Sequence, residues 1–150
     1  MSPRAIPERL RRWLATLGER CEYCSTSEWI TGIPLEVDHI RPRSRRGATS
    51  QSNLCHACSS CNTNKGDQTH GLDPVTGQRV RLFNPRRQRW PEHFEWSEDG
   101  TQIVGLTDCG RATVEALKNE QPAYRASSSV VDQRGMASPG RIRQPIIFHV

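Results

Sequence analysis

Apolar and aromatic residues are scarce in this sequence. Of its 150 residues, 34% are apolar and 6% are aromatic. A chain of this composition buries only a modest core, and domains with modest cores usually need a metal ion or cross-links for stability. The sequence contains six cysteines, which are the residues able to provide either form of support.

Long hydrophobic segments are absent as well. No run of apolar residues approaches the roughly 20 that cross a lipid bilayer, and the N-terminal stretch MSPRAIPERLRRWL has no apolar segment of the secretory type. We therefore expect an intracellular, cytoplasmic protein that binds no membrane. In that compartment cysteines more often bind metal ions than form disulfides.

The net charge of +5 is unevenly distributed along the chain. Lys and Arg outnumber Asp and Glu in residues 1–66 and 121–150, whereas acidic residues predominate slightly in residues 67–120. A basic surface suits a polyphosphate partner such as a nucleic acid. It is equally typical of a solvated surface that favours arginine, and composition alone does not separate the two readings.

The first part of the chain predicts a helix followed by two strands. Residues 5–17 have apolar side chains at near-helical spacing and are followed by Gly18, which indicates an amphipathic helix. Residues 28–40 are rich in β-branched and aromatic side chains and predict a bent strand or hairpin. Residues 41–52 have no apolar period and many turn formers, so they predict a basic loop. Residues 53–57 are long enough for a second strand.

The later part of the chain predicts short elements. Residues 58–65 indicate a short helix that stops at Gly66. Residues 72–106 predict short strands separated by turns, and Thr107 can cap a helix that runs to about Leu117. The aromatic side chains in this part are expected to pack over a small sheet rather than stack on bases; they are Trp90, Phe94 and Trp96.

Two cysteine pairs have the spacing of a zinc site. Cys21 and Cys24 form one CxxC pair, and Cys58 and Cys61 form another. Two residues between cysteines let both thiolates face one ion, and two such pairs complete the tetrahedral set of a closed, structural Zn²⁺ site. The alternative is two unrelated, redox-active pairs. The other two cysteines, at positions 55 and 109, have no partner at this spacing and are expected to be buried as small apolar residues.

The residues between the two pairs resemble a known family. The runs Glu36-Val37-Asp38-His39, Asn53-Leu54 and Cys61-Asn62-x-x-Lys65 look like the ββα-metal finger of HNH endonucleases, in the zinc-binding branch of that family. Asn62 stands where the literal motif has histidine, so this is a His-Asn-Asn variant. The resemblance implies a metal-dependent endonuclease that hydrolyses DNA phosphodiester bonds. The later segment from Leu82 resembles extensions of small bacterial HNH proteins, which suggests a bacterial or phage-like origin.

The resemblance also implies a role for each residue of the motif. His39 would be the general base, because imidazole can accept a proton from water near neutral pH. Asn53 would orient His39 across the hairpin, while Asp38 and Asn62 would bind the catalytic cation. Two oxygen ligands suit Mg²⁺ or Mn²⁺. In a regular strand Asp38 and His39 point to opposite faces, so a bend or the strand end must bring them to one site.

Basic residues crowd around the motif. They contact phosphates or simply solvate the loop, and their position beside the proposed site favours phosphate contacts. These residues are Arg41, Arg43, Arg45, Arg46 and Lys65. Glu36 is expected to be a plain exposed strand residue. The sequence carries no indication of the oligomeric state.

Together these patterns predict an α+β fold, a small ββα-metal finger with a structural zinc site, an N-terminal helix and a short-stranded C-terminal extension. The predicted segments are a helix at 1–20, the zinc-stapled core at 21–66, a β-rich extension ending in a helix at 67–120 and a disordered tail at 121–150.

A second class of function fits part of the sequence. A non-catalytic, zinc-dependent module that binds nucleic acid would explain the cysteine pairs and the basic charge. It would not explain why Asp38, His39 and Asn62 occur together in the order of a nuclease motif.

Overall fold

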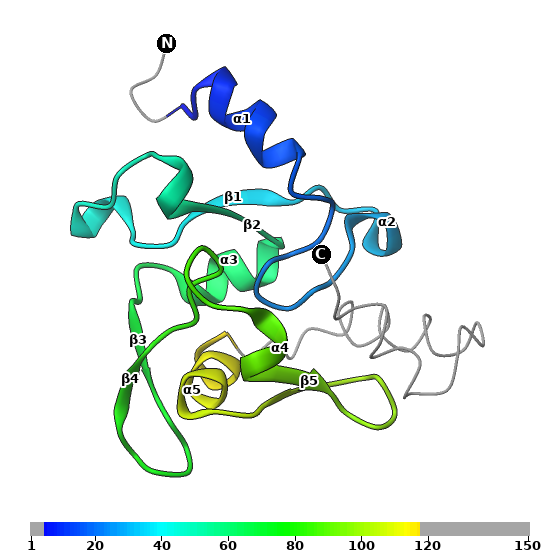
Figure 1. Ribbon diagram of the computed structural model, residues 1–150, viewed down its shortest axis with the longest axis vertical. Coiled ribbons are helices and arrows are strands. Elements are labelled where there is room, and N and C mark those ends of the chain that lie inside the picture. The colour runs from blue at the N-terminus through cyan, green and yellow to red at the C-terminus, as the bar shows by residue number, and fades with distance from the viewer. Residues whose placement is uncertain (1–4, 118–150) are drawn as a thin grey trace.

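The computed structural model describes residues 5–117, drawn in colour in Figure 1. Within this range, the structure consists of short helices and three antiparallel two-stranded sheets. The α+β class expected from the sequence is therefore confirmed. The predicted disordered tail at 121–150 lies outside the described residues. None of the helices between residues 5 and 117 is long and apolar enough to span a bilayer.

The N-terminal helix α1 spans Glu8–Ala15. It is shorter than the predicted 5–17, because Pro7 precedes the first turn and Thr16 caps the last one. Leu10 and Leu14 are buried and pack against Leu54 of the second strand. This contact fastens α1 across the hairpin of strands β1 (Glu36–His39) and β2 (Leu54–Ala57) (Figure 1).

The segment predicted as a bent strand at 28–40 is a strand only in its last part. Its first part is the one-turn helix α2, Glu28–Thr31, and the prediction of extended structure there is wrong. The Ser27 side chain accepts a hydrogen bond from the backbone nitrogen of Trp29, which starts the turn. Gly32 ends it with φ of 69°, a left-handed conformation that favours glycine.

A hairpin and a helix follow in the order predicted from the motif. Strand β1, Glu36–His39, pairs antiparallel with β2, Leu54–Ala57, so that Asp38 lies opposite Cys55. The loop between the strands contains two 3-10 turns, η1 (Arg43–Arg45) and η2 (Gln51–Asn53). Helix α3, Ser59–Lys65, starts at once after β2 and packs against both strands.

The extension adds two further hairpins and a closing helix. Its strands are β3 (His70–Leu72), β4 (Arg79–Arg81), β5 (Phe94–Trp96) and β6 (Ile103–Gly105), and β3 pairs with β4 and β5 with β6. The turn signals of the sequence are confirmed at Gly77 and Gly100, both with positive φ. The short helix α4, Trp90–His93, was not predicted; it carries a proline in its first turn.

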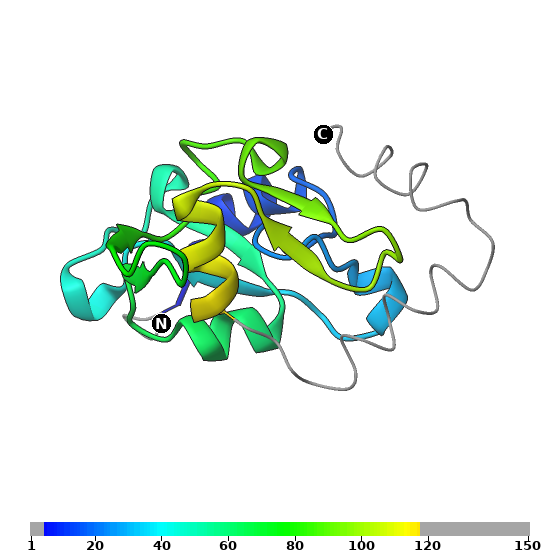
Figure 2. The ribbon, with the colours of Figure 1, turned by 90° about the horizontal axis from the view of Figure 1, so that it is seen from below.

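Helix α5, Asp108–Ala116, closes the extension. The Thr107 hydroxyl accepts a hydrogen bond from the backbone nitrogen of Gly110, which is the cap predicted from the sequence. The helix lies against β3, β4 and β6 (Figure 2).

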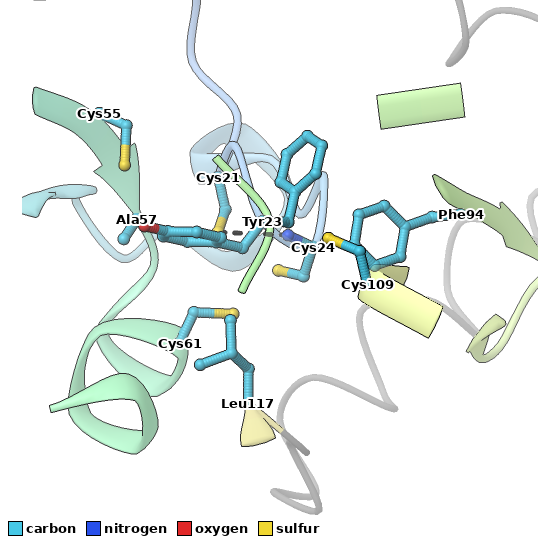
Figure 3. Close-up of a cluster of buried hydrophobic side chains, with 10 residues drawn as sticks. Cys21, Tyr23, Cys24, Cys55, Ala57, Cys61, Phe94, Cys109 and Leu117 are labelled. Atoms are coloured by element: carbon cyan, nitrogen blue, oxygen red, sulfur yellow. Dashed lines mark hydrogen bonds between the residues drawn. The ribbon is translucent and has the colours of Figure 1, made fainter. Parts of the chain in front are cut away.

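One core joins the ββα unit to the extension (Figure 3). Phe83 and Phe94 are each 2% exposed and meet edge to face with ring centroids 5.1 Å apart. They pack against Tyr23 and the buried cysteines of the ββα unit. The indole nitrogen of Trp90 donates to the Tyr23 carbonyl at 2.9 Å. The structural role predicted for the three late aromatic residues is therefore confirmed.

Replacement of Phe94 tests this shared core. Phe94→Ala should lower the free energy of unfolding by about 3–5 kcal/mol, because it removes a fully buried ring and leaves a cavity. The measurement is urea denaturation, with Trp29→Ala as the control, since Trp29 is 81% exposed. Equal stability of Phe94→Ala and Trp29→Ala would contradict a core that spans both segments.

Candidate active site

The two CxxC pairs converge on one point. The sulfur atoms of Cys21, Cys24, Cys58 and Cys61 all lie within 4.8 Å of one another. Cys24 Sγ and Cys58 Sγ are 3.7 Å apart, close to the roughly 3.8 Å expected between thiolates around a tetrahedral zinc with Zn–S bonds of about 2.3 Å. Figure 3 labels three of these four residues, Cys21, Cys24 and Cys61, and shows their sulfur atoms turned towards one another.

Backbone hydrogen bonds shape each pair for metal binding. The Cys24 nitrogen donates to Cys21 Sγ at 3.5 Å, and the Cys61 nitrogen donates to Cys58 Sγ at 3.4 Å. These bonds stabilise negative charge on sulfur. Both pairs therefore have the same local geometry, and α3 begins at one of them because Cys58 is its N-cap.

The protonation of the cluster also fits a dication. Burial, followed by hydrogen bonds from neighbouring thiols, raises the pKa of Cys21, whereas hydrogen bonds from the other thiols, Cys21 first, lower the pKa of Cys58. Hydrogen bonds between the thiols thus couple the protonation of Cys21 to that of Cys58. Four soft sulfur donors in a closed, buried cluster suit Zn²⁺, which would bind them all as thiolates.

The remaining cysteines lie outside this cluster, as predicted. Cys55 is fully buried and Cys109 is 7% exposed. His56 is half-buried, and its backbone pairs with Glu22 through the Glu22 nitrogen and carboxylate. Among the described residues, none of these three joins the metal-binding group.

Asp38 lies on the inner face of the hairpin. Its side chain is 7% exposed, accepts a hydrogen bond from the Tyr23 hydroxyl at 2.7 Å, and lies 3.1 Å from the ammonium of Lys65. Tyr23 was not predicted to take part. The signal for it was its place inside the first CxxC pair, where a buried tyrosine hydroxyl needs a partner.

Lys65, which was predicted to contact phosphate, is bound within the fold. Its side chain is 1% exposed, and its ammonium pairs with Asp38 and donates to the His39 carbonyl at 3.1 Å. Lys65 ends α3 on the side that faces β1, and a buried ammonium there needs the carboxylate as a partner. It therefore holds the helix against the strand.

Asn62 contacts the same face of β1 as Lys65, at Glu36, two residues before Asp38. Its amide nitrogen donates to the Glu36 carboxylate at 2.5 Å. Glu36 and Asp38 share a strand face because they are two residues apart, and Asn62 and Lys65 are neighbours on α3. Two polar contacts thus run side by side between β1 and α3. Glu36 is exposed, as expected, but its carboxylate is bound to Asn62.

His39 lies on the other face of the strand, as alternation predicts, and the expected bend towards Asp38 is not seen in β1, which pairs regularly with β2 as far as His39. Its ring is half-buried, and Nε2 lies 2.9 Å from the Thr49 hydroxyl. Burial lowers the pKa of His39 below its usual value, and the positive charge of Arg43 lowers it further. The ring is therefore neutral near pH 7. Thr49 was not identified from the sequence, because it reaches His39 only through the fold of the loop.

Asn53 holds the loop rather than the histidine ring. Its Oδ1 accepts from the Arg41 nitrogen at 2.8 Å, and its Nδ2 donates to the carbonyls of Arg41 and Ala48 at 3.0 and 2.8 Å. The loop also closes tightly at Gly47, where an added Cβ would lie 1.7 Å from the Arg41 oxygen. Asn53 therefore acts on His39 at one remove, through the loop that carries Thr49.

The predicted arginines lie on this loop and are exposed. Arg41 Nε donates to the Arg45 carbonyl at 2.8 Å, and Arg45 Nε donates to the Asp67 carbonyl at 2.6 Å. Each guanidinium has further N–H groups beyond these bonds. Arg43 lies close enough to His39 to lower its pKa, and Arg46 ends the η1 turn of the same loop.

Comparison with known families matches this part of the chain. Residues 21–68 match the HNH endonuclease family model. The HNH segment runs from the first zinc cysteine to just beyond α3, and it contains the cysteine cluster and every residue of the predicted nuclease motif. The resemblance seen in the sequence is confirmed for this segment, which is about a third of the chain. An HNH domain indicates a nuclease-related function with a nucleic-acid substrate.

No curated protein and no solved structure gives a significant match to the chain.

The cysteine cluster predicts the metal content. The purified protein should contain one tightly bound Zn²⁺, and Cys58→Ser should unfold or aggregate it, because structural zinc supplies on the order of 10 kcal/mol of folding free energy. Elemental analysis after purification without chelator tests this. Cys109→Ser is the matched control and should keep its zinc. A zinc-free, folded wild type would contradict the site.

The buried pair of Lys65 and Asp38 predicts a second stability effect. Lys65→Met should lower the free energy of unfolding by about 3–5 kcal/mol, because it leaves the Asp38 carboxylate buried without a cation. Adding Asp38→Asn should restore part of the loss, since neither charge then remains. Urea denaturation of both variants tests this, with Arg46→Gln as an exposed control. A Lys65→Met protein as stable as this control would show that the pair does not form.

Proposed function

We propose that this protein is a metal-dependent endonuclease that hydrolyses DNA phosphodiester bonds. His39 is the general base, and Asp38 and Asn62 hold a single Mg²⁺ or Mn²⁺. The observation that carries the proposal is the state of His39, a half-buried ring kept neutral at the end of β1 within the HNH segment. A neutral imidazole is the form that accepts a proton from water.

Thr49 positions His39 in both of its protonation states. A hydroxyl accepts a hydrogen bond when Nε2 carries a hydrogen and donates one when it does not. The 2.9 Å contact can therefore persist as the ring takes up a proton. Asn53 supports this contact by holding the loop in a closed shape.

Asp38 and Asn62 supply oxygen ligands of the kind that hard cations prefer. The Tyr23 hydroxyl donates to Oδ2 of Asp38 at 2.7 Å, and the Lys65 ammonium lies 3.1 Å from Oδ2 and 3.4 Å from Oδ1. A cation would therefore bind through Oδ1, which is the less tightly held of the two oxygens. Glu36 engages the Asn62 amide through its nitrogen and so orients the amide oxygen. The cation, when bound, neutralises charge on the phosphate and on the leaving oxygen.

The non-catalytic binding module keeps one argument in its favour. Lys65 already neutralises the Asp38 carboxylate, so the carboxylate needs no metal ion for its burial. A neighbouring ammonium also weakens the binding of a dication. Cleavage assays therefore decide between the two functions.

His39→Ala should reduce cleavage by about 10²–10⁴-fold while zinc content and DNA affinity stay close to wild type, because a general base acts only during proton transfer. The assay is nicking of supercoiled plasmid DNA across a series of Mg²⁺ and Mn²⁺ concentrations. The matched control is His56→Ala, which removes a half-buried histidine from the same hairpin and should remain active.

In the same assay, Asn62→Ala distinguishes the loss of a metal ligand from the loss of the general base. Its defect should shrink as Mg²⁺ or Mn²⁺ is raised, whereas the His39→Ala defect should not. A wild type that never cuts with any divalent cation, or a His39→Ala protein that cuts as well as wild type, would overturn the nuclease and leave the binding module.

A further inference from the structure

A cavity opens between the loop of the HNH segment and the extension. Its volume is about 580 Å³. Figure 1 and Figure 2 both place the loop and the hairpin of β3 and β4 at the same edge of the molecule. Arginines from the two segments line it together: Arg41, Arg45 and Arg46 come from the loop, and Arg81 and Arg87 come from the extension.

The lining of this cavity is positive. Within the described part of the chain, no aspartate or glutamate lines it; Asp67 lies 3.8 Å from the lining Arg45, and Asp38 lies 3.1 Å from the ammonium of Lys65, which also lines the cavity. Leu82 and Phe83 contribute apolar side chains to the lining, while Asn53 and Asn84 add polar groups. Arginines that line one cavity without a carboxylate in the lining repel one another unless an anion joins them.

The pKa of a histidine in the cavity lining indicates the same positive electrostatic potential. His70 lines the cavity, and its pKa is lowered by burial first and then by the positive charges of Arg79, Arg81 and Arg45. The neighbourhood therefore disfavours a further positive charge and favours an anion.

We propose that this cavity binds backbone phosphates of a DNA strand and that the extension, through Arg81 and Arg87, forms part of the substrate-binding surface. The proposal rests on the nuclease function proposed above. Guanidinium groups bind phosphate oxygens in a two-pronged geometry, and the volume exceeds that of a single inorganic anion.

The loop connects this cavity to the candidate site. Residues of the 41–53 loop line the cavity, and Thr49 of that loop contacts His39. Asn53 belongs to both, because it lines the cavity and clamps the loop. A strand bound in the cavity thus lies on the loop that positions the proposed base, which favours a DNA strand over an unrelated acidic partner.

The test compares pairs of exposed arginines. Arg81→Gln and Arg87→Gln remove charges that line the cavity. Their matched controls are Arg9→Gln, on helix α1, and Arg89→Gln, two residues beyond Arg87; both controls are exposed and lie outside the cavity lining. None of the four is part of the proposed catalytic machinery.

Binding of a short, fluorescently labelled DNA duplex is measured against salt concentration, without added Mg²⁺. The slope of log affinity against log salt should fall by about 1 for each of Arg81→Gln and Arg87→Gln and by about 2 for the double variant, because each lost phosphate contact releases fewer counterions. The controls should keep the wild-type slope. Slopes of the cavity variants equal to those of the controls would overturn the proposal.

Competition by inorganic phosphate or a mononucleotide identifies the source of the anion. If the double variant loses sensitivity to these competitors but keeps the wild-type slope for DNA, the cavity takes free anions and the assignment to a DNA strand is wrong. Binding is measured without cleavage, so the two proposals are tested separately. If the wild type binds DNA as expected but never cuts it, the nuclease proposal is wrong and the assignment of the cavity to DNA is supported. If the wild type cuts DNA and the cavity variants keep the wild-type salt slope, the assignment of the cavity to DNA is wrong and the nuclease proposal stands.

Discussion

The structure depends on the convergence of four cysteine side chains. They join the turn at Cys21 to the first turn of α3, across 34 positions of sequence between Cys24 and Cys58. The same cluster belongs to the core that contains Phe83, Phe94 and Leu117, so the extension packs on the metal-binding unit rather than beside it. In a chain with few apolar residues, this arrangement concentrates burial around a cluster where a metal ion can add stability.

The hairpin of β1 and β2 distributes its chemistry over two faces. Asp38 and Glu36 face α3, where Lys65 and Asn62 meet them, and His39 faces the loop. Alternation along a strand forces this separation. A carboxylate buried with an ammonium is held in one orientation. The loop hydroxyl holds the histidine, and burial and the charge of Arg43 lower its pKa. The proposed catalysis uses both groups from the end of the same strand.

The loop between the two strands links the parts of the molecule that act on a substrate. It is closed by three hydrogen bonds of Asn53 and by the close approach of the backbone at Gly47. One side of the loop carries Thr49 against His39, and another side forms a basic cavity with the extension. Packing that completes the core, at Leu82 and Phe83, therefore also places Arg81 and Arg87 beside the loop.

The sequence by itself determined the local features. The CxxC spacing predicted both halves of the cysteine cluster, the turn residues predicted the hairpins of the extension, and strand alternation predicted that Asp38 and His39 face opposite ways. Each of these depends on residues within one turn or one strand. The partners of buried polar groups could not be predicted in this way. The sequence predicts Lys65 to be a surface residue, and only the packing of α3 on β1 makes it the partner of Asp38. The tertiary structure likewise decided that α2 is a helix and that Thr49 contacts His39. Spacing sets the direction of a side chain within its own element, whereas its partner depends on which distant element the core brings to it.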